Sequence, residues 1–174
     1  MNRELVFYGA ISLDGYLARM DGSLDWLIGT EGEDESGYEE FYETIGTVLM
    51  GRKTYDEILG MFPDEFPYAG KACYVFSREK KGFDGQVTFV NEDIEEFVRA
   101  LKEQEGGRIW MVGGGQALAP LLDAGLVDEL VIQITPAVLG GGLPLFSAGV
   151  RERRFDLKEV RRFGQFAELR YRKK

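Results

Sequence analysis

The chain has 174 residues, of which 44% are hydrophobic and 13% aromatic, and this composition predicts a single domain over residues 1–174 with a sizeable core. Aspartate and glutamate number 30 against 21 lysines and arginines, so the net charge of -9 disfavours nucleic acid or an anionic membrane surface as a partner. The chain contains no histidine, which excludes Ser-His-Asp and Cys-His catalysis and the zinc sites that need imidazole, and we expect no metal.

In the first half of the chain, strand-like runs alternate with helix-like segments. The run Leu5–Ile11 predicts a first buried strand, because it is short, apolar and partly β-branched or aromatic. A helix is predicted next, after an S-x-x-E capping box formed by Ser36 and Glu39. Its apolar positions at helical spacing are Tyr38, Phe41, Tyr42 and Ile45. Further strands are predicted at Val48–Met50, Ala72–Phe76 and Val87–Val90.

The second half continues the alternation and then changes character. A D-x-x-E capping box of Asp93 and Glu96 predicts a helix, whose apolar positions are Ile94, Phe97, Val98 and Leu101. Strands are predicted at Ile109–Val112 and Leu130–Thr135, and between them lies a helix carrying Leu118, Leu121 and Leu122 that ends near a left-handed cap at Gly125. Around Gly164, the segments Phe155–Arg162 and Phe166–Tyr171 predict an antiparallel hairpin joined to a largely parallel sheet.

Cys73 is the only cysteine, so no intrachain disulfide can form. It lies in the apolar run ACYVF, which favours a core residue over a nucleophile. Nothing at the N-terminus resembles a signal peptide, and no apolar run approaches the roughly 20 residues needed to span a bilayer. We therefore expect a cytoplasmic protein.

Two strand-to-helix junctions carry the main functional signal. In IWMVGGGQ, from Ile109 to Gln116, an apolar run stops at three glycines and passes into a helix. Glycines permit a close approach of backbone to ligand, and a helix N-terminus offers free N–H groups and a positive dipole end. A second junction of this kind is VLMGRKTY, from Val48 to Tyr55. Two such junctions indicate a ligand with an extended, doubly charged middle, such as a dinucleotide pyrophosphate, and favour a nicotinamide-dependent reductase.

The order of these pieces resembles the dihydrofolate reductase-like superfamily over nearly the whole chain. The matching pieces are YGAISLDGYLA at Tyr8–Ala18, MGRKTYDEI at Met50–Ile58, YVFSR at Tyr74–Arg78, VTFV at Val87–Val90 and MVGGGQ at Met111–Gln116. SLDGYLA, together with TPAVLGGGLPLF at Thr135–Phe146, looks more like the reductase domain of bifunctional riboflavin biosynthesis enzymes and its free-standing relatives. The resemblance implies an α/β fold of three layers, with helices on both faces of a mostly parallel central sheet and an antiparallel C-terminal hairpin.

The resemblance also implies an NADPH site. Ala10, Leu17 and Ala18 would line the nicotinamide pocket, and Gly51, Arg52, Lys53 and Thr54 would receive the pyrophosphate and ribose phosphate. Val112, Gly113, Gly114, Gly115 and Gln116 would carry the other phosphate face, with Gln116 in place of an arginine common in folate reductases. Ser77 and Arg78 would meet the adenosine ribose phosphate, and the nearby Lys80 and Lys81 favour NADPH over NADH. The structural alternatives are loop packing, a solvated first helical turn and an exposed basic turn.

The substrate residues are less determined by the sequence. True folate reductases carry an acid early in the first helix, and here Asp34 and Glu35 lie closest to that position, although acids before a helix also complement its dipole. Asp14, Asp25 and Trp26 compete for substrate contacts, because an aspartate can hold a hydroxyl or ring N–H and an indole can stack on a ring. Phe146 follows a glycine turn bordering the expected cleft, where it contacts ligand or fills the core beneath the loop.

The sequence therefore predicts an NADPH-dependent reductase of a small heterocyclic or sugar-linked pyrimidine substrate. The implied reference reaction is that of a 5-amino-6-(5-phosphoribosylamino)uracil reductase in riboflavin biosynthesis. A pterin or dihydrofolate-type reductase and a non-catalytic nucleotide-binding module stay as alternatives. Relatives of this domain are often dimers, and the C-terminal hairpin offers an edge for pairing, so we expect a homodimer.

Overall fold

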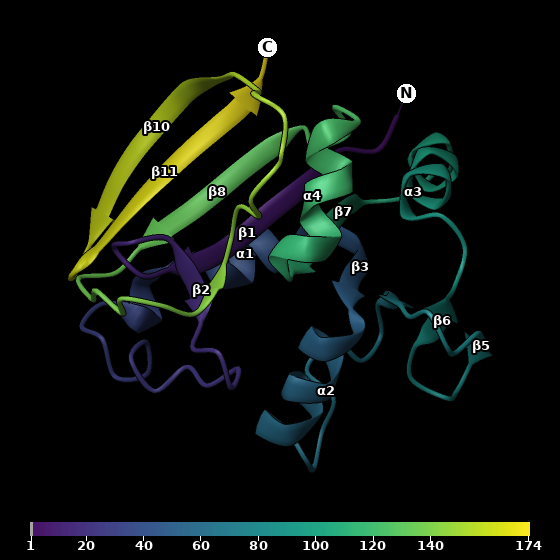
Figure 1. Cartoon of the computed structure of the whole chain (residues 1–174), viewed down its shortest axis with the longest axis horizontal. Coiled ribbons are helices and arrows are strands. Elements are labelled where there is room, and N and C mark those ends of the chain that lie inside the picture. Colours follow the sequence, from purple (N-terminus) through teal and green to yellow (C-terminus); the bar gives the residue numbers. More distant parts are fainter. Residues whose placement is uncertain (1) are drawn as a thin grey trace.

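In a computed structural model, residues 2–174 are described, and nine of their strands form one sheet in the order β10-β11-β8-β1-β7-β3-β4-β6-β5. Figure 1 shows the hairpin β10–β11 at one end of this sheet and β5–β6 at the other. The strands are β1 (Leu5–Ile11), β3 (Ile45–Gly51), β4 (Ala72–Phe76), β5 (Gly82–Phe83), β6 (Thr88–Val90), β7 (Arg108–Gly113), β8 (Glu129–Ile134), β10 (Phe155–Phe163) and β11 (Phe166–Lys173). A separate pair joins β2 (Tyr16–Ala18) to β9 (Leu143–Pro144).

Pairing within the sheet is parallel from β8 through β1, β7, β3 and β4 to β6, and antiparallel at β5–β6, β8–β11 and β10–β11. The predicted mostly parallel sheet with an antiparallel C-terminal hairpin is thus confirmed. Gly164 supplies the hairpin turn with a φ of 53°, and a Cβ atom there would lie 2.1 Å from the carbonyl oxygen of Glu31. Only glycine fits this turn.

Helices cover both faces of the sheet, as predicted. They are η1 (Glu33–Glu35, a 3-10 helix), α1 (Tyr38–Glu43), α2 (Arg52–Met61), α3 (Ile94–Glu103) and α4 (Gly115–Asp123). On one face, Val98 of α3 and Leu118 of α4 pack against Phe7 of β1. On the other face, Phe41 of α1 and Ile58 of α2 pack in the cluster that contains Val6 and Tyr8 of β1. The alternation of inward-pointing side chains along β1 therefore builds two cores from one strand.

Most predicted boundaries agree with the structure. Asp93 caps α3 by accepting a hydrogen bond from the Glu96 backbone N–H at 3.0 Å, and Gly125 follows α4 with a left-handed φ of 68°. The capping box at Ser36 is wrong, because Gly37 occupies the N-cap position of α1 and the helix has no side-chain cap. Ile45 also belongs to β3 rather than to the helix. The helix ends at Glu43 because Thr44 caps its C-terminus, where the Thr44 backbone N–H and hydroxyl both donate to the Phe41 carbonyl oxygen.

Cys73 is a core residue, as its sequence context predicts. Its side chain is buried on β4, and burial raises the pKa of its thiol to about 11. A thiol with such a pKa stays protonated near neutral pH and is a poor nucleophile. None of the helices described by the structure is long and apolar enough to cross a membrane.

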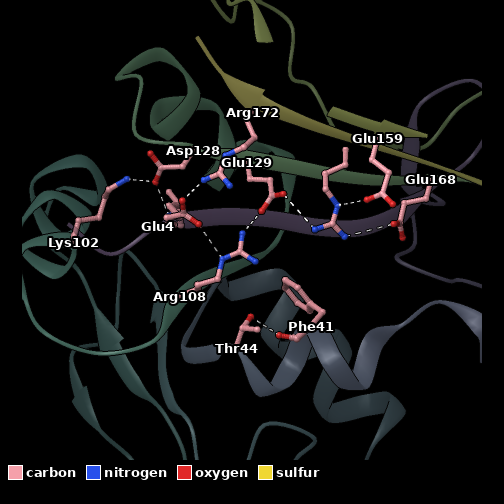
Figure 2. Close-up of polar contacts among 12 residues, drawn as sticks. Glu4, Phe41, Thr44, Lys102, Arg108, Asp128, Glu129, Glu159, Glu168 and Arg172 are labelled. Atoms are coloured by element: carbon pink, nitrogen blue, oxygen red, sulfur yellow. Dashed lines mark hydrogen bonds and ion pairs between the residues drawn. The ribbon is translucent and has the colours of Figure 1, made fainter. Parts of the chain in front are cut away.

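Ion pairs tie the ends of the central strands together (Figure 2). Lys102 of α3 is 7% exposed and pairs with Asp128, whose carboxylate also accepts from the Leu5 backbone N–H at 2.7 Å and from Lys173 at 2.7 Å. Burial by itself raises the pKa of Asp128, but the hydrogen bonds from Lys102, Lys173 and Leu5 outweigh it and the pKa lies below its ordinary value. The stability from this carboxylate is therefore present above the unfolded-state pKa and is lost as pH falls through the folded-state pKa.

We predict that Asp128→Ala lowers the free energy of unfolding by about 3 kcal/mol at neutral pH, because it leaves the buried Lys102 ammonium without a carboxylate and with only the Leu126 carbonyl oxygen as acceptor. The control is Glu95→Ala, which breaks the exposed pair with Arg99 on α3 and should cost less than about 0.5 kcal/mol. Urea unfolding followed by circular dichroism measures both values. Equal losses in the two variants would contradict the role given to Asp128.

Candidate functional site

A cleft of about 1570 Å³ opens at the carboxyl ends of the central parallel strands. Ala10 of β1, Gly51 of β3, Phe76 of β4 and Gly113 of β7 all line it. Parallel pairing places these strand ends at one edge of the sheet, which is where open α/β sheets bind ligands. Figure 1 shows α2 and α4 beginning at this edge, next to the strands that they follow.

The two strand-to-helix junctions predicted from the sequence meet in this cleft. The N-cap residues of α2 and α4 are Gly51 and Gly114, and neither helix has a side-chain cap. An ideal Cβ on Gly51 would lie 3.8 Å from the Gly114 backbone nitrogen, and one on Gly114 would lie 3.6 Å from Thr54 Oγ1. The uncapped N–H groups of two helices therefore converge on one small region, beside a hydroxyl, and this arrangement suits a bound anion.

Gly115, at the start of α4, fixes the position of that helix against the opposite wall. A Cβ at this position would lie 2.3 Å from the Pro144 carbonyl oxygen in β9. No side chain larger than a hydrogen atom fits there, because the conflicting atom belongs to the backbone. The contact holds the β2–β9 pair, which contributes Leu17, Ala18, Leu143 and Pro144 to the cleft lining, directly over the α4 N-terminus.

A group of cations surrounds the outer end of the cleft. Arg52 and Lys80 both lie over the ring of the buried Phe89, at 5.4 Å and 5.1 Å from its centroid. Arg78 follows β4 and lines the same cleft. Ser77 organises this turn, since its hydroxyl oxygen accepts from the Lys80 backbone N–H at 3.1 Å. In a chain with a net charge of -9, such convergence of positive charge favours an anionic ligand.

Every residue that the sequence analysis assigned to the cofactor lines this cleft, and their individual roles stay predictions. They are Ala10, Leu17, Ala18, Gly51, Arg52, Lys53, Thr54, Ser77, Arg78, Val112, Gly113, Gly114, Gly115 and Gln116. The residues present fit a dinucleotide phosphate, because two uncapped helix starts, a glycine cradle and several cations meet in one place. Arg52 pairs with Asp56 at 2.9 Å on the exposed side of the first turn, and a dinucleotide phosphate would add a second anionic partner for it.

The residues predicted for substrate and catalysis lie outside the set that lines the cleft, and their roles stay predictions. Asp34 and Glu35 are exposed on η1. Asp25 is exposed and pairs with Arg19 at 2.7 Å, while the neighbouring indole Nε1 of Trp26 is buried without a partner among the described residues. Phe146 is 47% exposed beyond β9.

Asp14 joins the loop before β2 to the loop before β9 by hydrogen bonds. Its carboxylate accepts from Ser12 Oγ at 2.7 Å and from the backbone N–H groups of Leu139 and Gly140 at 3.1 and 2.8 Å. The Ser12 hydrogen bond, followed by the backbone ones, lowers the pKa of Asp14 to about 2. The geometry gives this aspartate a structural contact that joins two loops.

The inner half of the cleft contains residues that the sequence analysis did not select. Tyr8, Tyr68 and Trp110 are buried aromatic residues that line it, with Gln133 beside them. Gln133 could have been found from the sequence, because it is a polar residue inside the apolar strand run LVIQI. The structure buries it. The three aromatic residues could not have been found in this way, because their spacing and apolar neighbours are those of ordinary core residues.

Glu57 of α2 also lines the cleft and was not selected from the sequence. Its Oε1 atom is buried and has no hydrogen-bond partner among residues 2–174. Burial raises the pKa of Glu57, and the nearby Lys53 only partly opposes this. A carboxyl with a raised pKa in a cleft is a candidate proton donor.

Comparisons with known proteins agree with this geometry. Residues 69–167 match the family model of the RibD C-terminal domain. The uncharacterised Bacillus subtilis protein YwjB is 42% identical over 98% of both chains.

Solved structures show the same fold. A putative riboflavin biosynthesis protein from Shewanella sp. PV-4 superposes with a TM-score of 0.84 at 29% identity, covering 100% of this chain and 99% of that one. A diaminohydroxyphosphoribosylaminopyrimidine deaminase/5-amino-6-(5-phosphoribosylamino)uracil reductase from Thermotoga maritima superposes with a TM-score of 0.73 at 18% identity, and 99% of this chain matches 57% of it. The protein therefore belongs to the RibD C-terminal domain family and has its dihydrofolate reductase-like fold.

Proposed function

We propose that this protein is an NADPH-dependent reductase of a small heterocyclic substrate. The observation that carries the proposal is the convergence of two uncapped helix N-termini on one cleft edged by Arg52, Lys53 and Arg78. Membership of a family that includes reductase domains supports it. An extended ligand with a pyrophosphate at its middle and a further phosphate near β4 would satisfy all of these groups.

When bound, NADPH supplies a hydride to an electrophilic carbon of a C=N or C=O bond, and a proton added to the neighbouring nitrogen or oxygen completes the reduction. The chain's own groups orient the reactants and control the proton. Ala10, Leu17 and Ala18 give the inner end of the cofactor site small and aliphatic walls against which a flat ring can lie. Glu57 lines the same cleft, and its protonated form would deliver the proton.

For the substrate, we propose a compound with an aminouracil ring, the ring that is named for the Thermotoga maritima enzyme. The Shewanella protein, which matches over its whole length, supports a link to riboflavin biosynthesis. A pterin is the second candidate, and it is favoured by the flat aromatic inner half of the cleft formed around Tyr8, Tyr68 and Trp110. A nucleotide-binding module without catalysis would bind NADPH and turn over neither compound.

We predict that Arg78→Ala weakens NADPH binding about tenfold and leaves NADH binding within about twofold, because a guanidinium bound to the 2′-phosphate has no partner in NADH. The control variant is Arg99→Ala, which removes an exposed arginine of α3 that pairs with Glu95. Isothermal titration calorimetry measures both affinities. Equal weakening of NADPH and NADH would contradict the assignment of Arg78.

We predict that Glu57→Gln lowers kcat at least about tenfold with NADPH affinity unchanged, because the amide cannot donate the proton. In the parent enzyme kcat should fall as pH rises through the raised pKa of Glu57, since the protonated form is the donor, and Glu57→Gln should lose this dependence. Steady-state NADPH oxidation across pH measures both effects. If kcat falls instead in Asp34→Asn or Glu35→Gln, the proton donor lies on η1, as the sequence analysis predicted.

A further inference from the structure

The inner half of the cleft has a floor of buried aromatic rings. The ring of Trp110 is perpendicular to those of Tyr8 and Tyr68, with interplanar angles of 89° and 82° and centroid distances of 6.3 and 5.3 Å. Tyr8 is held from behind by Phe41, which stacks on it at 4.1 Å. Such interlocked rings are rigid, and together they form an apolar wall that suits a planar ligand.

Gln133, which stands beside this floor, has a fixed amide orientation. Its Nε2 group donates to Tyr8 Oη at 2.9 Å and to Glu168 Oε2 at 2.8 Å. The same Glu168 oxygen accepts from Arg161 at 3.2 Å, and the glutamate side chain is 2% exposed. Both amide hydrogens of Gln133 are therefore committed, which identifies Nε2 and leaves Oε1 as the acceptor that this residue offers to the cleft.

The positive charges lie elsewhere in the cleft. Among the described residues that line it, the cationic ones are Arg52, Lys53 and Arg78, at the first turn of α2 and after β4. The proposed function assigns all three to the cofactor, which leaves no other cation of the lining for a second phosphate. The remaining ionisable residues that α2 contributes to the lining are the acids Asp56 and Glu57.

A phosphate in the inner half would therefore lack the cations that such groups usually find in proteins. Arg161 is not among the residues that line the cleft, and its Nη2 group donates to Glu168 and, at 2.6 Å, to the Ser36 carbonyl oxygen. The inner half instead combines flat apolar rings with one neutral acceptor. This combination matches an uncharged planar heterocycle that carries a ring N–H.

We propose that Gln133 Oε1 is the specificity-determining acceptor for a ring N–H of an uncharged planar substrate, and that this site takes its substrate without a phosphate group. This inference rests on the proposed function, because it concerns the substrate of the same cleft. Ligand binding tests it without any measurement of turnover. The inference also separates this protein from the phosphorylated substrate named for the Thermotoga maritima enzyme.

The first test compares ligands and leaves the protein unchanged. The probes are 5,6-diaminouracil and its 1,3-dimethyl derivative, which lacks both ring N–H groups, titrated calorimetrically into the protein saturated with NADP+. We expect the dimethyl compound to bind at least about tenfold more weakly, because Gln133 Oε1 would be left without a donor. Equal affinity, or no binding of either probe, would overturn the proposal.

The second test concerns phosphate. The probes are 5-amino-6-ribosylaminouracil and its 5′-phosphate, and we expect their dissociation constants to agree within about threefold, because no cation of the inner half gains a partner. A phosphate that tightens binding by more than about thirtyfold would overturn the proposal.

Gln133→Leu supplies the residue-level test, with Gln165→Leu as the control on the exposed hairpin turn. We expect Gln133→Leu to weaken 5,6-diaminouracil about tenfold and to leave the NADP+ affinity unchanged, which also shows that the variant folds. Unchanged affinity for 5,6-diaminouracil would overturn the proposal. Failure of NADPH to bind the parent protein would defeat the proposed function, whereas normal NADPH binding with wrong probe preferences would defeat only this inference.

Discussion

The site depends on the parallel pairing of β3 with β7, which brings two strand-to-helix junctions to the same edge of the sheet. Each junction alone leaves a few helix N–H groups without partners, which is common in proteins. Together, the starts of α2 and α4 lie close enough for Gly51 and Gly114 to be neighbours. A single extended anion can then contact both helices, and the cations at the outer end add a third region of positive charge.

A different kind of chemistry builds the inner half of the cleft. There the structure buries polar groups in a chain of hydrogen bonds from Tyr8 through Gln133 to Glu168. Buried networks of this kind are costly unless every member is satisfied, and here Arg161 completes the carboxylate end. The result is one carbonyl oxygen held in a fixed position beside rigid aromatic rings. The outer half thus selects charge, and the inner half selects shape and hydrogen-bonding pattern.

Sequence patterns predicted most strands, one helix cap and the residues of the cofactor end of the cleft, but not the polar residues that the tertiary fold buries in it. The runs of β1 and β4 were predicted at their observed bounds, because each is a short apolar segment between polar ones, and Asp93 was identified as a cap from its spacing to Glu96. The predicted Ser36 cap was wrong, because Gly37 adopts a left-handed conformation that begins α1 without a side-chain cap.

Glu57 and Gln133 escaped selection for a related reason. A glutamate in a short amphipathic helix and a glutamine in a strand have many ordinary roles, and only the tertiary arrangement shows that both line the cleft.

The most direct test of the account is a titration of the purified protein with NADPH and with NADH, followed by the intrinsic tryptophan fluorescence, because Trp110 lines the cleft. Saturable quenching that is tighter for NADPH is the predicted result. Absence of saturable quenching by either nucleotide, confirmed by calorimetry, would contradict the claim that the paired junctions hold a dinucleotide.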